Sequence, residues 1–374
     1  MRIRMTKTVL NLFGLIGCLS LGIYSQSTPC ITPTRQNGFC VPLKHCQNIR
    51  DILLLNKKYN NITSGVLNYI RKSVCHLPGV ATAVCCQLTE LDETINKLIT
   101  DKNSLPKNCG TTIVDRISNG QKTAIFEYPW MALLRYKDFD GDIVEACGGS
   151  LIHERYVLTA AHCLNDRQFD LDHVRLGEHN KNTEIDCLEE GYCAGPVQDI
   201  PIENTITHPN YNNPRYANDI GLVRLEKSVK FEDHIKPICL PTTAGVRQLV
   251  HDKYVLTGWG KTEKNVLSSV LLQATLPRIE NAQCERLISN RVMGSSVSLT
   301  EKQMCAGGIH LTDSCRGDSG GPLGTIAMLY DEPRFVQFGI VSVGIDVCGR
   351  YNVPSIYTRV SSYMDWIINN LKPS

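Results

Sequence analysis

Short apolar runs separated by turn residues dominate the chain after residue 117. Examples are 132–134, 157–159, 220–225 and 338–341. Runs of this kind are typical of β-strands joined by turns, so they predict an all-β domain. The last segment differs, because apolar side chains recur at helical spacing across 361–371. We expect a closing helix there.

The first residues have the pattern of an export signal. Basic side chains precede an apolar stretch over 9–23, and small Ser25 lies near a plausible cleavage point. A membrane anchor is the alternative interpretation, but the stretch is short and no later stretch is long enough to span a bilayer. We therefore expect residues 1–25 to be a signal peptide and the protein to be secreted and extracellular.

Cysteine usage agrees with export. Removal of Cys18 with the signal leaves 16 of the 17 cysteines, an even number that could be fully paired in an oxidising compartment. Zinc is the usual alternative for a cysteine-rich chain, but no two cysteines have C-x2-C spacing, which argues against a metal site built from cysteines.

Six cysteines form a compact group near the start of the mature chain: Cys30, Cys40, Cys46, Cys75, Cys85 and Cys86. This segment is too short to hold a large core by itself, so it needs covalent staples, although spacing alone leaves many connectivities open. We expect a disulfide-rich domain over 29–86, with the chain's only N-glycosylation acceptor at Asn61.

The following residues are polar, and 87–106 contain no cysteine. We interpret 87–116 as a linker and activation segment, with a helical stretch around 91–99 where apolar side chains fall on one face.

Composition sets broad limits. The 374 residues exceed one typical domain, and a hydrophobic fraction of 42% suffices for a sizeable core. A formal net charge of +2 provides no general attraction to nucleic acid or to an anionic membrane, so we expect neither as a partner.

The strongest chemical signal is the run 317–322, Gly-Asp-Ser-Gly-Gly-Pro, centred on Ser319. Glycines on both sides permit a tight turn in which backbone N–H groups point at one spot. Such a run alone is usually a surface loop. Here His162 lies upstream in Thr-Ala-Ala-His-Cys and Asp219 in Asn-Asp-Ile-Gly-Leu, so histidine, aspartate and serine occur in an order known for catalytic triads.

From Ile117 to about Leu371 the chain resembles the chymotrypsin/trypsin-like serine proteases. Besides the three motifs, Pro129-Trp130, the run Pro-Ile-Cys-Leu-Pro over 237–241, and Gly-Trp-Gly over 258–260 match landmarks of that family. The resemblance implies two six-stranded β-barrels with the active site in the cleft between them.

The same resemblance implies the catalytic roles. Ser319 would be the nucleophile, His162 the general base and acid, and Asp219 the residue that holds the histidine tautomer. The N–H groups of Gly317 and Ser319 would form the oxyanion hole.

The six early cysteines, with their adjacent final pair, resemble the clip domain of arthropod serine proteases. The two resemblances imply these disulfides: Cys30–Cys85, Cys40–Cys75, Cys46–Cys86, Cys109–Cys239, Cys147–Cys163, Cys284–Cys305 and Cys315–Cys348. Cys187 and Cys193 remain, close enough in sequence to close a local loop. The Cys109–Cys239 bridge would hold the clip domain and linker onto the protease after activation.

The family pattern places an activation cleavage between Arg116 and Ile117, whereas the alternative is a plain loop leading into a strand. Cleavage would free an α-ammonium on Ile117. Asp318 supports the cleavage hypothesis, because a carboxylate beside the nucleophile would be costly to bury without a cation. In the family, the new amino terminus pairs with that aspartate and orders the oxyanion hole.

Substrate preference follows from Asp313, at the position of the pocket floor in trypsin-like members. A buried carboxylate there would receive Arg or Lys, and an aspartate that merely caps a turn is the alternative. The resemblance implies that Ser342, Gly344 and Ser355 are further substrate-binding positions. Ser355 replaces a wall glycine and Val343 replaces an aromatic residue, so we expect Arg preference to survive while the preference for neighbouring substrate residues stays open.

A loop that begins at Glu178 resembles the calcium loop of trypsin. Oxygen ligands would come from Glu178, the carbonyls of Asn180 and Thr183, and Asp186. A solvated acidic loop is the alternative. We expect structural calcium and no organic cofactor.

Together these features predict a secreted zymogen endopeptidase that an upstream protease activates and that cuts another protein after Arg or Lys. Clip-domain relatives act in arthropod extracellular cascades such as melanisation and Toll-ligand processing, which implies an innate-immune role, a haemolymph location and a serpin-type inhibitor. One alternative is a catalytically silent clip-domain homologue that acts as a binding cofactor, but the triad is complete. A digestive trypsin is the other, which the clip-like domain disfavours.

Overall fold

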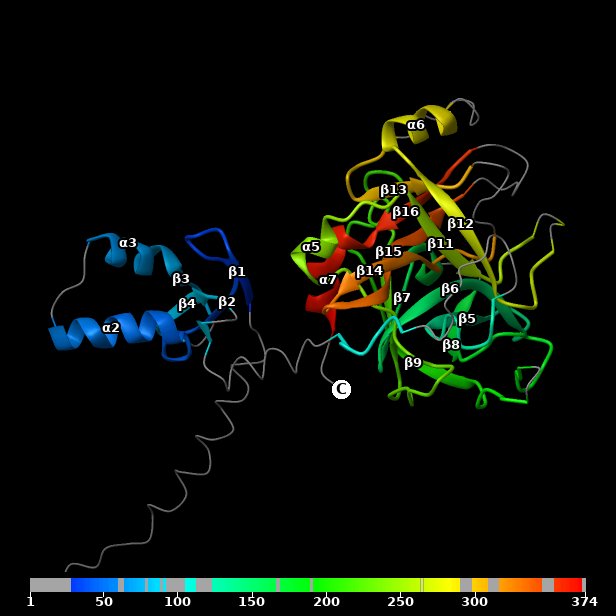
Figure 1. Cartoon of the computed structure of the whole chain (residues 1–374), viewed down its shortest axis with the longest axis horizontal. Helices are drawn as coiled ribbons and strands as arrows, with labels where there is room; N and C mark the ends of the chain where they lie inside the picture. Colours follow the sequence, from blue (N-terminus) through cyan, green and yellow to red (C-terminus); the bar gives the residue numbers. More distant parts are fainter. Residues whose placement is uncertain are drawn as a thin grey trace, which may run out of the picture. The chain divides into compact units, whose positions relative to one another are not determined.

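A computed structural model gives the conformation of the chain (Figure 1). It describes residues 28–59, 64–77, 80–87, 90–91, 105–111, 123–165, 169–188, 191–262, 264, 266–289, 298–308, 316–344 and 353–371. The chain divides into two compact units, with the boundary between residues 104 and 105. The expected signal peptide over 1–25, Asn61 and most of the linker lie outside the described residues.

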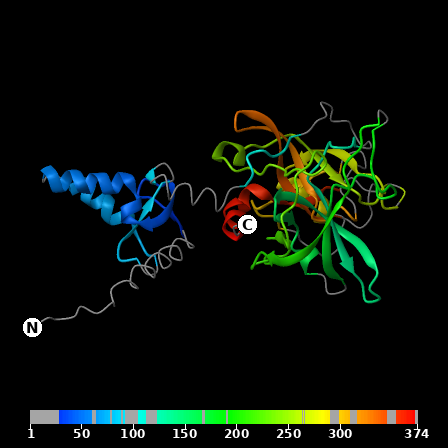
Figure 2. The same ribbon diagram turned by 90° about the horizontal axis from the view of Figure 1, so that it is seen from below.

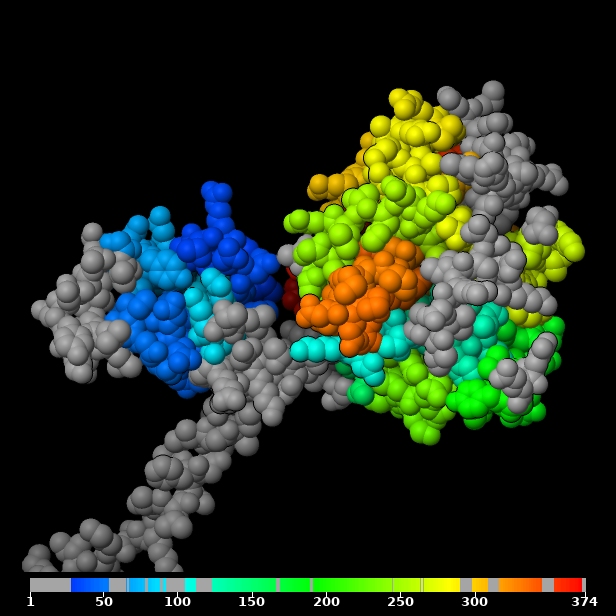
Figure 3. Space-filling view, viewed as in Figure 1, coloured from blue at the N-terminus to red at the C-terminus, as the bar shows by residue number. Residues whose placement is uncertain are grey.

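The first unit combines a small sheet with two helices (blue to cyan in Figures 1 and 3). The antiparallel strands pair in the order β1(Thr28–Ile31), β2(Asn37–Pro42), β4(Ala83–Cys86), β3(Val74–Cys75). Between Cys46 and Cys75 the chain forms α2(Gln47–Tyr59) and α3(Ser64–Ser73), which the sequence pattern did not predict.

Covalent staples supplement the small core of this unit. That core contains Val41, Ile49, Val84 and Leu91 around the Cys46–Cys86 disulfide. Cys30–Cys85 and Cys40–Cys75 complete the three pairs that the clip resemblance implies. A core of this size contributes little on its own, so the disulfides carry much of the stability.

The second unit contains two closed six-stranded barrels. The strands of the first barrel, green in Figure 2, pair in the order β10-β7-β6-β5-β8-β9. Their bounds are β5(Met131–Lys137), β6(Ile143–His153), β7(Tyr156–Thr159), β8(Asp170–Leu176), β9(Gln198–Thr207) and β10(Gly221–Leu225).

The second barrel has the order β11-β12-β13-β16-β15-β14. Its bounds are β11(Lys253–Gly258), β12(Leu272–Ile279), β13(Gln303–Ala306), β14(Pro322–Leu329), β15(Glu332–Val343) and β16(Ser355–Arg359). The helices α5(Ala244–Arg247) and α6(Asn281–Ser289) precede β11 and β13 in the chain. The apolar runs at 132–134, 157–159 and 338–341 lie in β5, β7 and β15, and 221–225 form β10, so the prediction of an all-β double barrel is confirmed.

The expected closing helix begins as a 3-10 turn over Val360–Tyr363 and continues as α7(Met364–Asn370), red in Figure 2. Met364 and Ile367 are fully buried and belong to the same hydrophobic cluster as Leu158 of β7. Because α7 follows the last strand of the second barrel, this packing ties that barrel to the first.

The segment 105–111 is attached to the second unit by the Cys109–Cys239 disulfide. Gly110 adds two backbone hydrogen bonds, one to the carbonyl of Pro237 and one from the N–H of Phe335. Its φ of +60° and the 2.3 Å between a built Cβ and the Phe335 carbonyl leave no room for another residue type. None of the described helices is both long and apolar enough to cross a bilayer.

Leu158 is fully buried in the first barrel. We expect Leu158→Ala to lower the free energy of unfolding by about 2–5 kcal/mol, because truncation loses buried apolar surface and leaves a cavity. Phe139→Ala is the control, since Phe139 is 86% exposed, and it should change that energy by less than about 0.5 kcal/mol. Urea unfolding of the purified protein measures both, and equal effects would contradict the packing described above.

Candidate active site

His162 and Asp219 meet because the strands that precede and follow them pair. β7 ends at Thr159 and leads to His162, while Asp219 comes just before β10, and Thr159 is in register with Gly221. The imidazole Nδ1 of His162 lies 2.8 Å from Oδ2 of Asp219, and the His162 backbone N–H donates to Oδ1 at 2.9 Å. The carboxylate therefore holds both the ring and the backbone of the histidine.

The second barrel completes the surroundings of Asp219. Ser342 in β15 donates its hydroxyl to Oδ2 at 2.6 Å, and Thr358 in β16 donates to the Asp219 main-chain carbonyl at 2.7 Å. Burial by itself raises the pKa of the Asp219 carboxyl, but the bonds from His162 and Ser342 outweigh it and the net pKa lies below the usual value. Asp219 is thus ionised at neutral pH and can stabilise a protonated imidazole.

Asn218 holds the backbone that carries Asp219, a role that the sequence analysis missed. Its φ of +58° is in the left-handed region, and its side chain donates to the carbonyls of Asn210 and Asn213. Tyr363 donates its hydroxyl to Asn218 Oδ1 at 2.9 Å, and burial raises the pKa of Tyr363 to about 12, so the donor stays protonated. In the sequence, the only sign of this supporting role is that Asn218 directly precedes Asp219. Its partner Tyr363 lies far along the chain, in the region of the closing helix.

The turn around Ser319 packs against the first barrel. Gly320 has a φ of +77°, and a Cβ there would lie 2.1 Å from the hydroxyl oxygen of Thr159 and 2.5 Å from the carbonyl of Gly148. The N–H of Gly148 donates to the Ser319 carbonyl at 2.8 Å. The half-buried serine is therefore seated beside the strand that leads to His162.

Asp318 is buried directly before the serine, with 8% of its surface exposed. Its Oδ1 accepts a hydrogen bond from the Gly260 N–H at 2.8 Å. A Cβ on Gly258 or Gly260 would lie 2.1 Å or 2.4 Å from the carboxyl group, so both glycines are needed for this close approach. Gly317, on the other side of Asp318, has a φ of +103°.

The remaining pocket positions are only partly described. Ser342 and Val343 end β15, Gly344 is exposed, and Ser355 begins β16 with no exposed surface. Ser355 Oγ has no hydrogen-bond partner among the residues that the structure describes. Arg116, Ile117, Asp313 and the Cys315–Cys348 pair lie outside those residues.

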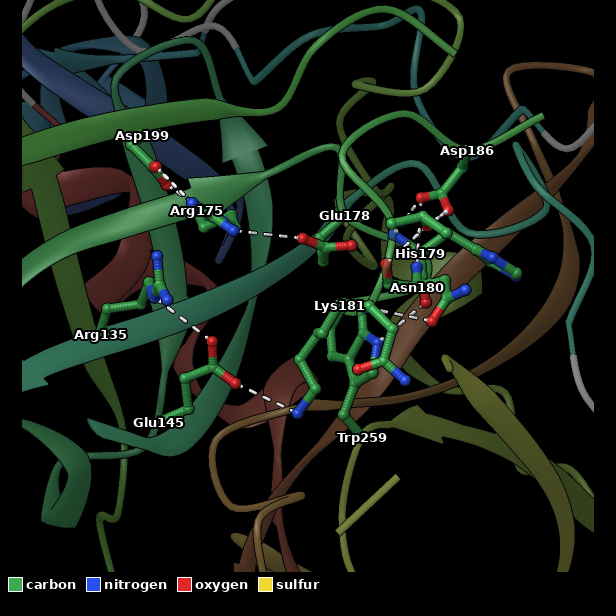
Figure 4. Close-up of polar contacts among 12 residues, drawn as sticks. Arg135, Glu145, Arg175, Glu178, His179, Asn180, Lys181, Asp186, Asp199 and Trp259 are labelled. Carbon is green, nitrogen blue, oxygen red and sulfur yellow. Dashed lines mark hydrogen bonds and ion pairs between the residues drawn. The ribbon is translucent and has the colours of Figure 1, made fainter. Parts of the chain in front are cut away.

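The loop over 177–186 has the geometry shown in Figure 4. Asp186 Oδ2 accepts from the N–H groups of His179 and Asn180, each at 3.1 Å, and Oδ1 accepts from the Thr183 hydroxyl at 2.6 Å. Glu178 Oε2 pairs with Arg175 at 3.4 Å. Within the described part of the chain, the buried Oε1 of Glu178 has no hydrogen-bond partner.

The carboxyl group of Glu178 is poorly stabilised in its charged form. Burial and the nearby charge of Asp186 raise the pKa of Glu178 above its usual value despite the opposing effect of Arg175. A hard divalent cation between oxygen ligands would relieve that cost.

Two other groups of potential metal ligands are explained by disulfides. Cys147 and Cys163 lie beside His162, and Cys46 and Cys86 lie beside Glu90. Both cysteine pairs are oxidised, so neither offers a thiolate. Cys187–Cys193 and Cys284–Cys305 are also formed, so every expected pair whose two cysteines are described is present; Cys315 and Cys348 lie outside the described residues.

Comparison with known proteins decides the family. The family model for trypsin matches residues 117–367. The chain belongs to the trypsin family of serine proteases. A second model, the regulatory CLIP domain of proteinases, matches residues 30–86. The expectation of a clip-domain serine endopeptidase is confirmed.

Relatives of this trypsin-family chain align with it over most of its length. Serine protease grass of Drosophila melanogaster is 37% identical over 374 aligned residues, which cover 96% of each chain. Phenoloxidase-activating factor 3 of Holotrichia diomphalia is 35% identical, with 93% of this chain and 95% of its own covered. The crystal structure of the Drosophila Grass clip serine protease of the Toll pathway matches with a TM-score of 0.68 at 37% identity, covering 93% of this chain and 99% of the other.

The geometry around Ser319 generates a direct test. We expect Ser319→Ala to reduce amide hydrolysis by the activated protease by about a million-fold, because no other group supplies the nucleophile. Ser228→Ala is the matched control, since that serine is exposed and its hydroxyl donates to Glu154, which belongs to none of the three motifs. Rates on an arginine reporter amide, with secretion yield measured in parallel, check both; substantial retained activity in Ser319→Ala would refute the assignment.

Proposed function

We propose that the protein is a secreted zymogen, that cleavage between Arg116 and Ile117 activates it, and that the enzyme then cuts proteins after Arg or Lys. The observation that carries the proposal is the buried carboxylate of Asp318 beside Ser319. A positive charge brought to a buried carboxylate acts strongly, because little water screens it. The α-ammonium that cleavage frees on Ile117 is such a charge.

That ion pair would act on catalysis through the backbone. Asp318 lies between Gly317 and Ser319, whose N–H groups we assign to the oxyanion hole. Fixing the Asp318 side chain restricts the peptide planes on both sides of it. One oxyanion-hole donor contributes about 3–4 kcal/mol of transition-state stabilisation, so an unformed hole is enough to keep a zymogen nearly silent.

The chemistry that we assign to the triad is supported by the contact between His162 and Asp219. Ser319 Oγ attacks the scissile carbonyl while His162 Nε2 takes its proton, and the same nitrogen later protonates the leaving amine. Asp219 fixes the tautomer, because its Oδ2 faces Nδ1 at 2.8 Å. Its ionised state then stabilises the imidazolium that forms.

Substrate preference is assigned to Asp313, whose carboxylate would pair with an Arg or Lys side chain in the pocket. Ser355 adds bulk at the position that we assign to the pocket wall. It is fully buried and lies in register with Ala306 of β13. Arg preference should therefore persist in a narrower pocket.

The cascade assignment draws on the relatives. Grass is named as a clip serine protease of the Toll pathway, and the Holotrichia relative is named as a phenoloxidase-activating factor. We extend an extracellular cascade role of this kind to the present chain, with an upstream activating protease, a protein substrate, a serpin-type inhibitor and a haemolymph location. Cys109–Cys239 supports it, since the bridge would keep the clip domain attached after cleavage. A signal peptide over 1–25 and a glycan on Asn61 belong to the same proposal.

Activation and specificity can be tested together. Treatment of the purified zymogen with a trypsin-like protease should produce a new terminus, Ile-Ser-Asn-Gly, and hydrolysis of an arginine reporter at least about a hundred-fold faster than that of a phenylalanine reporter. Amino-terminal sequencing and rates on Arg, Lys and Phe reporters measure this outcome.

Two variants control the experiment. Arg116→Gln should stay uncleaved and silent, and Asp313→Ser should be cleaved normally yet lose the preference for Arg. Cleavage of the wild-type chain at Arg116 without any hydrolysis would instead favour a catalytically silent binding cofactor.

We further propose calcium as a structural ion of the 177–186 loop, held by Glu178, the carbonyls of Asn180 and Thr183, and Asp186. Two observations support the site. Glu178 Oε1 has no hydrogen-bond partner among the described residues, and the pKa of that carboxyl is raised. When bound, the ion would neutralise two carboxylates and stabilise the loop.

Removing the Glu178 charge should have opposite effects with and without calcium. In chelator, Glu178→Gln should raise the melting temperature by a few degrees near neutral pH, since the carboxylate is destabilising there; millimolar calcium should stabilise only the wild type. A carboxyl group whose pKa is raised on folding contributes stability at pH values below its pKa in the unfolded chain. That contribution is lost as the pH rises through its pKa in the folded protein. The chelated wild type should thus lose stability relative to the variant as the pH rises above about 4, the usual pKa of a glutamate side chain.

Glu184→Gln is the matched control, because Glu184 is exposed in the same loop. It should leave both the calcium response and the pH dependence unchanged. Equal calcium stabilisation of the wild type and Glu178→Gln would contradict the site.

A further inference from the structure

Trp259 lies between the 177–186 loop and the carboxylate of Asp318. It follows β11 directly, has 3% of its surface exposed and belongs to the larger hydrophobic cluster. Its two chain neighbours are the glycines that surround Asp318. The position of the indole is therefore linked to the seat of that carboxylate.

On the loop side, the indole N–H of Trp259 donates to the carbonyl of His179 at 3.2 Å (Figure 4). The same carbonyl accepts from the Leu271 N–H at 2.9 Å. Asp186 accepts a hydrogen bond from the His179 N–H at 3.1 Å. The loop therefore fixes the backbone of His179, including the carbonyl that the indole contacts. The next contact, from the Lys181 N–H to the Ser269 carbonyl at 2.8 Å, extends the pairing between loop and barrel.

On the side of the active site, Gly260 donates to Asp318 Oδ1 at 2.8 Å. The close approach at Gly258 and Gly260 means that a shift of this tripeptide by a few tenths of an ångström changes the room available to the carboxylate. A built Cβ on Gly317 would lie 3.1 Å from Cα of Gly260, so the same tripeptide also packs against the residue before Asp318.

We infer that Trp259 is a positioning residue that couples the conformation of the 177–186 loop to the oxyanion hole. The path runs from His179 through the Trp259 indole to the Gly260 N–H and Asp318, and so to the peptide planes of Gly317 and Ser319. The inference rests on the oxyanion-hole roles proposed above. Through this coupling, the conformation of the loop affects transition-state stabilisation as well as the stability of the protein.

The coupling predicts a specific kinetic signature. Trp259→Phe removes the indole N–H and keeps an aromatic ring in the core. We expect kcat of the activated enzyme to fall about five-fold, the value of one ordinary hydrogen bond, while KM changes less than about two-fold. The reason is that the oxyanion hole binds the tetrahedral transition state more tightly than the substrate.

Trp130→Phe is the matched control. Trp130 is fully buried and stacks on Phe335, with ring centroids 5.0 Å apart. Its indole nitrogen has no hydrogen-bond partner among the residues that the structure describes. Both variants should lower the melting temperature, but Trp130→Phe should leave kcat unchanged.

Two inhibitors separate the oxyanion hole from the pocket. A peptidyl arginine aldehyde forms a tetrahedral adduct with the serine, whereas benzamidine only fills the pocket. Trp259→Phe should weaken the aldehyde by the same factor as kcat and leave benzamidine unchanged. Equal weakening of both inhibitors, or a stability loss with kcat intact, would overturn the coupling.

A variant on the loop side tests the same path without touching the core. In chelator, Asp186→Asn weakens the hold on His179 and should lower kcat about two-fold to five-fold in the wild-type background, with benzamidine affinity unchanged. In the Trp259→Phe background it should have little further effect. Full additivity of the two changes would overturn the path through Trp259.

The outcome is distinguishable from a failure of the proposed function. If the wild-type chain is cleaved at Arg116 and hydrolyses no reporter, the function itself is wrong. If the activated wild type is efficient and Trp259→Phe retains its kcat, only the coupling is wrong.

Discussion

The need to accommodate two buried carboxylates governs the junction of the barrels. Asp219 is 2% exposed and Asp318 is 8% exposed. Asp219 accepts hydrogen bonds from His162 of the first barrel and from Ser342 of the second, so either barrel alone would leave the charge poorly satisfied. An unsatisfied buried charge costs several kcal/mol, which restricts the barrels to the arrangement in which both donors reach it.

The glycine-rich turn uses the same junction. Gly320 fits against Thr159 and Gly148 only because it lacks a side chain, and the Gly148 N–H anchors the Ser319 carbonyl. The serine is thus positioned relative to the histidine by contacts between barrels, not by local chain geometry. Asp318 in turn links this turn to the Gly-Trp-Gly tripeptide over 258–260. Two inputs, the α-ammonium proposed to follow cleavage and the loop over 177–186, then converge on one carboxylate.

The two units owe their stability to different sources. The first has a small core closed by three disulfides, whereas the barrels bury large continuous clusters. The segment that contains Cys109 is held by its own disulfide and by Gly110, so it belongs to the second unit although it precedes the proposed cleavage site. A cut at Arg116 would therefore change the chain terminus while leaving this attachment intact.

The sequence predicted the all-β class and the closing helix through local periodicity. It predicted the disulfide pairs that the structure describes, and the triad of His162, Asp219 and Ser319, through motifs that resemble those of two known families. It did not reveal α2 and α3, the support of Asp219 by Asn218 and Tyr363, or the link from His179 through Trp259 to Asp318. Such contacts join residues that are distant in the chain, for example Asn218 and Tyr363 at a separation of 145. Only the closure and docking of the barrels brings their polar atoms within hydrogen-bond distance, so the tertiary structure had to decide them.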